Sequence, residues 1–500
     1  MEHVEAKHAD RWIFACFLVL LVWAPIPLSS KRQWASSILE TGLFGLGMAW
    51  LALYALNLAR LPRTFRRAWP ALVLFGLWLL VLCVQVLPLP EAVIAALSRG
   101  SVEAGAGREA AQPWIGFRGP AAVISVDPEA SWEFLSRSLA YAAAFGLTLV
   151  LARSRNRLRA LAFVLIGSGV FQATLGSFFH LAGVRYELFD TVLDHSGSAM
   201  GTFVNRDHFA GYMEMTLAVG IGMMIATLRG GGPRTWRQML RDWVSWLVSP
   251  RVLLRLMLVV MVIALVMTRS RMGNSAFFVS MLIAGAIGLV LARHATRSTV
   301  ILLASLVVID IFVVGAWFGV EKVMHRLEQT SLTRSGKASH QAGGNGAEQS
   351  VEERVEPGLM ALKALKEFPF VGSGGGTFYV VFPKYREQEI DGYYDHAHND
   401  YVQFTTETGV VGVSLVGLLV LSTLLVALRT QYERRDPLAR GVAFGVTMGI
   451  IALLIHSWVD FNLQIPANAL TFVVLLAMGW VAQTVERVER VETVETVDRE

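Results

Sequence analysis

The stretch VVGVSLVGLLVLSTLLVAL, Val410–Leu428, contains no charged residue. As a helix rising about 1.5 Å per residue, it is long enough to cross the hydrocarbon core of a bilayer. The segment just before it, DHAHNDYVQFTTETG from Asp395 to Gly409, instead carries two histidines, an asparagine and several acids. Together the two segments predict a membrane helix that begins beside a polar site.

Comparable apolar blocks recur along the 500-residue chain, which is 54% hydrophobic and only 17% charged. Soluble domains usually carry about 25% charged residues. Cys16 and Cys83 both fall inside apolar blocks, so they indicate neither a disulfide framework nor a metal site. We predict an all-α integral membrane protein with about twelve transmembrane helices. The predicted spans are Trp12–Leu28, Ile38–Ala59, Leu72–Leu89, Leu139–Leu151, Leu161–Leu181, Phe209–Leu228, Leu253–Met267, Phe277–Leu291, Val300–Phe318, Val410–Leu428, Val442–Trp458 and Ala467–Val481.

Arginines follow every second predicted span, and basic loops stay in the cytoplasm. This pattern predicts that both termini are cytoplasmic. It also accounts for the net charge of +5 without a nucleic-acid partner. The basic loops are Arg60–Arg67, Arg153–Arg159, Arg229–Arg241, Arg293–Arg297 and Arg429–Arg440.

The same count places four segments on the external face: Pro90–Trp132, Ala182–Asp207, the short turn Arg269–Asn274, and Glu321–Asp400. We therefore divide the chain into N-terminal membrane helices (1–320), a long external loop that carries part of the site (321–400), C-terminal membrane helices (401–485) and a charged cytoplasmic tail (486–500).

Three polar groups accompany His396 and His398 on that face. In MTRSRMGN, Arg269 and Arg271 end a span, where they could anchor to lipid headgroups or form a guanidinium fork for a phosphate or diphosphate. In GTFVNRDHFAGYMEM, Asn205 and Arg206 are candidates for contacts with sugar or phosphate, whereas Asp207 is expected to be the N-cap of the next helix. Arg354, in EERVEP, would alone be a surface salt-bridge residue.

Two further patterns are weaker. HSWVDFNLQIPANA places His456, Asp460 and Asn462 between the last two spans, where a polar pair that locks helices together is favoured over catalysis. His396 and His398 could chelate a metal from an extended loop, but no cysteine or helical His-x-x-x-His pair accompanies them. We therefore expect no metal and no other cofactor.

The stretch HNDYVQFTTETGVVG resembles the signature of the O-antigen ligase and O-antigen polymerase superfamily. TRSRMGN, GTFVNRDHFAGY and FPFVGSGGGTF are similar to its supporting motifs and lie in the family's order, between Gly201 and Asn468. The resemblance implies a GT-C-like fold in the bacterial inner membrane. It also implies a metal-independent glycosyltransferase that moves a glycan from undecaprenyl diphosphate to an acceptor hydroxyl at the external face.

By matching motifs, the resemblance implies that His398 is catalytic, that Arg271 and Arg354 bind the diphosphate, and that Asn399 and Tyr401 belong to the substrate site. This chain doubles two of these positions, with His396 beside His398 and Arg269 beside Arg271. A neutral imidazole suits removal of a hydroxyl proton, and clamped arginines suit a departing diphosphate. The implied partners are the carrier-linked oligosaccharide, an acceptor glycan or lipid A core, and membrane lipids. A chain-length regulator or a flippase is the candidate protein partner.

Two other classes of function compete with the transferase. A transporter of lipid-linked glycans would show related halves with interrupted helices, and no clear repeat is present. A receptor without catalysis would tolerate replacement of Arg271 and His398. Among transferases we favour a polymerase over a ligase that uses lipid A core or protein, because GTFVNRDHFAGY and HSWVDFNLQIPANA resemble capsule and exopolysaccharide members.

Overall fold

The computed structural model describes residues 9–104, 123–227, 250–291, 358, 360–386 and 394–485. Within these ranges nine helices are long and apolar enough to cross a membrane. They are α3 (Gln33–Ala55), α5 (Trp69–Val86), α8 (Pro128–Leu151), α9 (Arg155–Leu181), α10 (Arg206–Thr227), α13 (Arg271–Leu291), α18 (Asp400–Glu433), α19 (Pro437–His456) and α20 (Pro466–Thr484). Two further apolar helices are α2 (Arg11–Trp23) and α12 (Pro250–Met267).

The all-α membrane fold is thereby confirmed. Each of these eleven helices overlaps one predicted span. The remaining predicted span, Val300–Phe318, lies outside the described residues, so the total of twelve and the GT-C-like arrangement stay predictions, as does the domain division around residues 321–357. The smaller elements are α4 (Arg63–Arg67), α6 (Glu91–Leu97), α17 (Phe378–Val381), a hairpin of β1 (Arg185–Leu188) and β2 (Thr191–Asp194), and the 3₁₀ turns η1 (Leu28–Ser30), η2 (Leu362–Lys366), η3 (Phe382–Lys384) and η4 (Asn462–Gln464).

The predicted external turn Arg269–Asn274 is wrong in its second half, because α13 already begins at Arg271. The Ser270 hydroxyl accepts a hydrogen bond from the Gly273 N–H at 3.0 Å, as an N-cap does. The predicted external segment Pro90–Trp132 likewise ends early. Asp127 accepts from the backbone N–H groups of Glu129 and Ala130, which starts α8 at Pro128.

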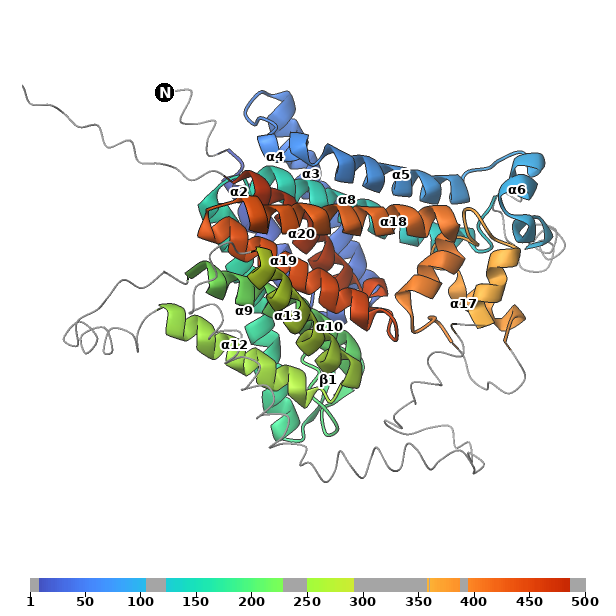
Figure 1. The fold of residues 1–500 in the computed structure, drawn as a ribbon. Coiled ribbons are helices and arrows are strands. Elements are labelled where there is room, and N and C mark those ends of the chain that lie inside the picture. Colours follow the sequence, from blue (N-terminus) through green and yellow to red (C-terminus); the bar gives the residue numbers. More distant parts are fainter. Residues whose placement is uncertain are drawn as a thin grey trace, which may run out of the picture.

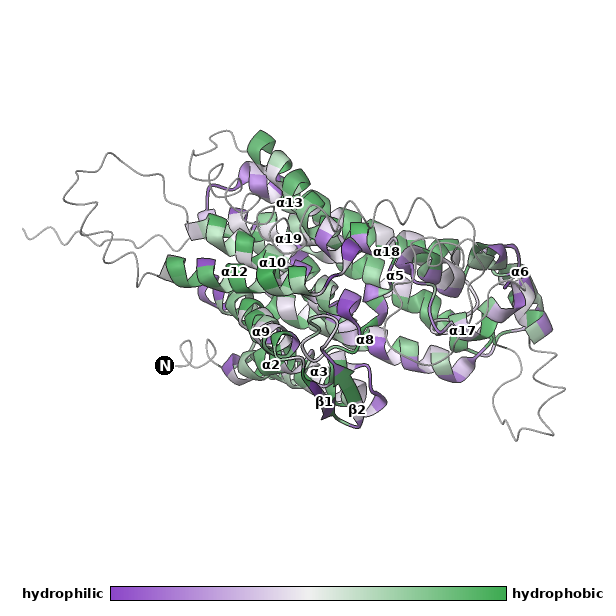
Figure 2. Ribbon diagram, turned by 90° about the horizontal axis from the view of Figure 1, so that it is seen from below, coloured by the Kyte–Doolittle hydropathy of each residue, from purple (hydrophilic) through white to green (hydrophobic). Residues whose placement is uncertain are grey.

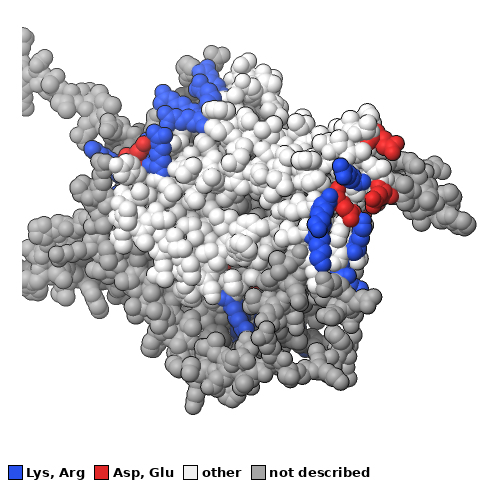
Figure 3. Space-filling view, turned by 45° about the vertical axis from the view of Figure 1, so that its right-hand side comes forward, with Lys and Arg blue, Asp and Glu red and all other residues white. Residues whose placement is uncertain are grey.

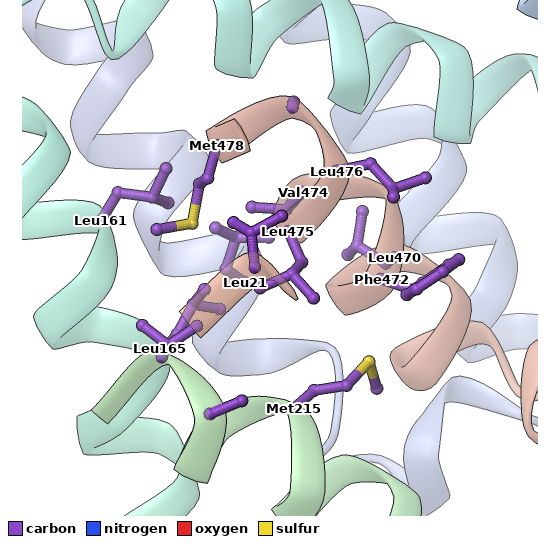
Figure 4. Packing of buried hydrophobic residues seen from close by; sticks show 14 of the residues in the cluster. Leu21, Leu161, Leu165, Met215, Leu470, Phe472, Val474, Leu475, Leu476 and Met478 are labelled. Carbon is purple, nitrogen blue, oxygen red and sulfur yellow. The ribbon is translucent and has the colours of Figure 1, made fainter. Parts of the chain in front are cut away.

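Helix α20 forms the centre of the bundle. Leu470, Val474 and Met478 on this helix are buried, and Figure 4 shows leucines of α2 and α9 and Met215 of α10 packed around it. Outward-facing residues such as Leu51, Leu282 and Leu425 are exposed, and Figure 2 shows that hydrophobic residues make up much of the long helices. Exposed apolar side chains are expected where lipid is the solvent.

The loops separate into two groups at opposite ends of the bundle. At one end, Asp10 pairs with Arg153 and Arg157, Arg155 with Asp436, and Thr64 with Thr484. We call this the basic end. At the other end, Lys31 pairs with Asp395, Arg32 bonds Thr191, and Gln33 bonds Glu133. We call this the histidine end.

Figure 3 shows a broad surface without charged residues between groups of charged side chains on the face in view. Three of the predicted cytoplasmic loops therefore meet at one end, together with the start of α2 and the end of α20. Which end faces the cytoplasm stays a prediction.

Helix α18 is broken at Gly409, whose φ of 67° and ψ of −176° are not helical. The N–H groups of Val410 and Val411 donate instead to the carbonyls of Pro369 and Phe370 at 3.0 and 3.1 Å. A Cβ at Gly409 would lie 2.3 Å from the Phe370 carbonyl oxygen, so only glycine fits here.

The glycine-rich segment FPFVGSGGGTF thus fills the break. Its Ser373 and Gly374 N–H groups take up the carbonyls of Thr406 and Glu407, both at 3.0 Å. Figure 1 shows this part of the chain, leading into α17, beside the start of α18. Asp400–Thr408 becomes a separate half-helix that carries the polar site.

Candidate functional site

Three histidines surround one buried aromatic ring at the histidine end. The ring centroid of Phe461 lies 4.2 Å from that of His396, 4.6 Å from that of His208 and 4.9 Å from that of His398. Lys31 Nζ lies 5.8 Å from the same centroid. We call His208, His396 and His398 the histidine cluster. It joins α10, the segment before α18 and the loop between α19 and α20.

The backbone places His398 with unusual geometry. Its φ of 48° is in the left-handed region, which few residues other than glycine adopt. Such strain often marks a functional site. Asn399 follows as the N-cap of α18: its Oδ1 accepts from the Val402 N–H at 3.1 Å, and its Nδ2 donates to the Trp458 carbonyl at 2.9 Å. His398 is thereby held at the start of a capped helix.

Asn399 and Tyr401 both make hydrogen bonds within the protein. The Tyr401 hydroxyl donates to the Leu454 carbonyl at 2.7 Å, and Asn399 is buried. These contacts fix α18 against the end of α19. A direct contact of either side chain with substrate stays a prediction.

His396 is held in a defined tautomer by Gln403. The Gln403 Oε1 accepts from the Ala397 N–H at 3.1 Å, so its amide nitrogen is the atom that lies 2.9 Å from His396 Nδ1. That nitrogen donates, so Nδ1 accepts and the proton of the neutral ring is on Nε2. Burial lowers the pKa of His396 to about 4, Asp395 opposes the shift, and Lys31 adds to it. His396 is therefore a neutral hydrogen-bond donor near pH 7.

A buried network of acids and amides contacts the histidine cluster through His208. His208 Nε2 lies 3.5 Å from Asp460 Oδ1, and His456 Nδ1 lies 2.8 Å from Glu214 Oε1. Asn468 links the network to Asn462 and to the His208 carbonyl, at 2.9 Å in each case. The predicted locking role of the HSWVDFNLQIPANA stretch agrees with these contacts, which join α10, α19 and α20.

Asp460 also interacts electrostatically with the predicted catalytic His398. Burial alone would raise the pKa of its carboxyl, but the neighbouring His208, His456 and His398 together bring this pKa well below its usual range. An anionic Asp460 beside His398 can stabilise the imidazolium that forms when the ring takes a proton. The sequence alone assigns no role to His208 and favours a structural role for Asp460. The only sequence signal for a functional role of either residue is its position within a motif.

The predicted diphosphate-binding arginines Arg269 and Arg271 belong to a different part of the chain, near the start of α13. Arg269, with a φ of 55°, and Arg271 are exposed at the junction of α12 and α13. Gly273, two residues on, packs against α10, since a Cβ there would lie 2.5 Å from Ala210 Cβ and 3.2 Å from Glu214 Oε1. The start of α13 thus borders the buried network. Arg354 lies outside the described residues.

The predicted capping role of Asp207 is wrong. Asn205 Oδ1 accepts from the Asp207 N–H at 2.8 Å, so Asn205 precedes and caps α10, and Asp207 is buried within its first turn. Arg206 is partly exposed as the first residue of α10. A substrate role for Asn205 and Arg206 stays a prediction.

A polar cavity of about 440 Å³ opens beside the histidine cluster. His396 lines it, together with Gln403 and Gln464. Its charged and hydroxyl-bearing lining residues are Lys31, Asp127, Glu129, Glu133, Arg137, Tyr379 and Asp395. Carboxylates and amides in one cavity can hydrogen-bond the hydroxyls of a sugar. Within the described residues, no three or more His, Cys, Asp and Glu side chains are grouped to hold a metal ion.

A family model described as O-antigen ligase matches residues 256–417. The match covers Arg269 and Arg271, both histidines before α18, and the break at Gly409, but neither His208 nor Asp460. No curated protein matches the chain. Members of this family are glycosyltransferase-like enzymes of polysaccharide biosynthesis that act on lipid-linked glycans and acceptors. The match over residues 256–417 thus supports the resemblance to the O-antigen ligase and O-antigen polymerase superfamily.

Proposed function

We propose that the protein transfers glycans from undecaprenyl diphosphate to a hydroxyl of a carrier-linked acceptor glycan, as a polymerase, at the external face of the bacterial inner membrane. The observation that carries the proposal is the histidine cluster beside a polar cavity, in a membrane chain with an O-antigen ligase domain. In this orientation the histidine end is external and both termini are cytoplasmic.

In the proposed reaction His398 takes the proton of the acceptor hydroxyl. The hydroxyl oxygen forms a bond with the anomeric carbon of the donor sugar, and the bond from that carbon to the diphosphate oxygen breaks. The diphosphate leaves as an anion on its lipid carrier, held by Arg269, Arg271 and Arg354. Asp460 stabilises the His398 imidazolium until the proton is released.

His396 takes a different role from His398. Its Nδ1 already accepts from Gln403, and its Nε2 carries the proton, so the ring presents a donor to the cavity. In the proposal it hydrogen-bonds a substrate oxygen and thereby orients the acceptor. We propose these residue roles together with a mechanism that requires no metal ion.

The test uses the purified protein in lipid nanodiscs with a carrier-linked oligosaccharide. Arg271→Ala should abolish transfer, and Arg271→Lys should impair it, because Lys keeps the charge but loses the planar fork. The control is Arg429→Ala, an exposed arginine paired with Glu433 on α18 at the basic end. Normal transfer by Arg271→Ala at normal abundance would overturn the diphosphate role.

A ligase is the alternative, since the matched domain carries that description. The products distinguish the two. A polymerase extends the glycan on the carrier, so gels show ladders of carrier-linked chains without lipid A core. A ligase produces no ladder until lipid A core is added, and then moves the label onto it.

A further inference from the structure

A second cavity, apolar in character, lies inside the helix bundle next to the polar one. It lies between α5, α8, α18 and α20 and is partly open to its surroundings. Phe75, Phe404, Leu419 and Phe472 are among the side chains that line it. Phe134, Arg137 and Gln464 line both cavities, so these three residues mark where the apolar cavity adjoins the polar one.

The apolar cavity contains hydrogen-bond donors that the protein does not use. The buried Nε1–H of Trp78 and the buried Nε2 of Gln464 have no hydrogen-bond partner within the described part of the chain, and both residues line the cavity. Trp78 is only 7% exposed. Buried donors without a partner are costly, and an oxygen-rich ligand would satisfy them.

Arg137 adds a positive charge at the same place. It lies nine residues after the start of α8, about 14 Å along the helix, within a span. Within the described residues it forms an ion pair with Glu133, at 3.1 Å, one turn away and also at the cavity. An ionisable residue inside a membrane span usually serves a function. A guanidinium, an indole N–H and an amide N–H together are donors suited to a phosphate.

We propose that the apolar cavity binds the single polyprenyl chain of the acceptor lipid, with the phosphate of that lipid on Arg137, Trp78 and Gln464 and its glycan in the polar cavity against His396. This inference rests on the proposed function, which it deepens by assigning a separate site to the acceptor. The donor diphosphate is assigned to Arg269 and Arg271 at the start of α13, and neither residue lines either cavity.

The shape and charge of the site favour a carrier-linked acceptor over a bilayer lipid. The apolar space lies between four helices and adjoins a cavity lined by carboxylates and amides that could bind sugar hydroxyls, which a phospholipid headgroup would not need. The acceptor would then be the growing or incoming carrier-linked glycan of a polymerase.

The test measures binding and not turnover. Undecaprenyl phosphate is titrated into the purified full-length protein in detergent, and bound lipid is counted by native mass spectrometry. Wild type should bind, and Arg137→Gln should bind about ten- to a hundredfold more weakly, because charge-assisted hydrogen bonds are lost. Trp78→Phe, which keeps the ring and removes the N–H, should weaken binding severalfold.

Arg429→Gln is the matched control. Arg429 and Glu433 form an ion pair between residues four positions apart on one helix, as Arg137 and Glu133 do in the reverse order, but they lie at the basic end. It should bind like wild type. Arg271→Gln should still bind one lipid in the cavity. Thermal unfolding of each variant checks folding, and Trp78→Phe provides a second measurement if Arg137→Gln does not fold.

Three results would overturn the inference. These are wild-type binding by both Arg137→Gln and Trp78→Phe, complete loss of binding in Arg271→Gln alone, or equal displacement of the probe by phosphatidylglycerol. The last result would identify a bilayer lipid. Because glycan transfer is not measured, failure of the proposed function would leave this binding intact, and loss of the cavity site would leave the transferase proposal to its own test.

Discussion

The two ends of the bundle both hold buried carboxylates beside cationic or titratable partners, but with different geometry. At the basic end, Asp10 is bound by Arg157 through two hydrogen bonds of 2.7 and 2.9 Å, and by Arg153 at 3.0 Å. At the histidine end, Asp460 faces His208 at 3.5 Å and His456 at 3.8 Å. The first set is tight and permanently charged, and the second is looser and built from imidazoles.

The difference indicates what each end is for. A guanidinium does not lose its proton in a protein, so the Asp10 cluster can only hold α2 against the loop between α8 and α9. An imidazole changes charge near neutral pH and can pass a proton on. Within the described residues, the histidine end has imidazoles next to a polar cavity, which suits acid–base chemistry.

The largest expected effect is the all-or-none signal of a topology reporter. A signal on the side opposite to the expected one would contradict the roles assigned to the two ends. Reporter fusions after Arg67, Arg157 and Arg435 should stay inside, and a fusion within 331–349 should report outside. The first three positions are at or near the basic end, whereas residues 331–349 lie outside the described ranges. An external signal after Arg435 would place the histidine cluster on the wrong side for this function.

The second effect is on the rate of glycan transfer. His398→Ala should lower the rate by about 10²- to 10⁴-fold, which is the usual contribution of a general base, while donor binding is kept. His398→Gln should not restore activity, because an amide does not take the proton. His396→Ala should cost less, since it removes a donor. Substantial turnover by His398→Ala would assign the base to another residue of the cluster.

The third effect concerns stability at the basic end. Asp10→Ala leaves Arg153 and Arg157 partly buried without their carboxylate, and breaking such a pair costs about 3–5 kcal/mol. Thermal unfolding in detergent should show the loss. The activity of the remaining folded protein should be unchanged, because no catalytic group has been moved. A fall in activity with unchanged stability would contradict the division between the two ends.

The smallest expected effect is on the pH dependence of the free energy of unfolding, to which His396 contributes. Its pKa is about 4 in the folded protein and 6.5 in the absence of the fold, so between these values the unfolded chain binds a proton that the folded chain does not. This contribution is present above pH 6.5 and is lost as the pH falls toward 4. It amounts to about 3 kcal/mol at most, less some screening because the side chain is 20% exposed.

Unfolding measured from pH 7.5 to 4.5 should therefore show a shallower loss of stability in His396→Gln than in wild type. The transfer rate offers a second comparison. A rate that falls only near pH 4 would point to His396 as the base, and one that falls near the ordinary imidazole pKa of about 6.5 would point to a different histidine.

The sequence by itself determined the solvent and the elements of this protein. Apolar blocks of membrane length admit one structure, the helix, because it satisfies its own backbone hydrogen bonds in lipid. The spacing of the arginines grouped the loops, and at the basic end Arg155, at the start of α9, pairs with Asp436, from the loop between α18 and α19. The motif before α18 marked His396, His398 and Asn399 as neighbours of a helix start.

Only the tertiary structure decided what these residues contact. Phe461 brings together histidines that are about 190 residues apart, and the capping of α10 by Asn205 moves Asp207 into the helix. The break at Gly409 was not predicted, because a single glycine between a polar and an apolar segment gives no local signal of an interrupted helix. Its cause is the carbonyl of Phe370, supplied by a distant segment. Likewise Arg137 and Trp78 line one cavity only because four helices leave space between them, and their proposed role depends on that packing. Contacts of this kind depend on packing between distant segments, which composition and spacing do not encode.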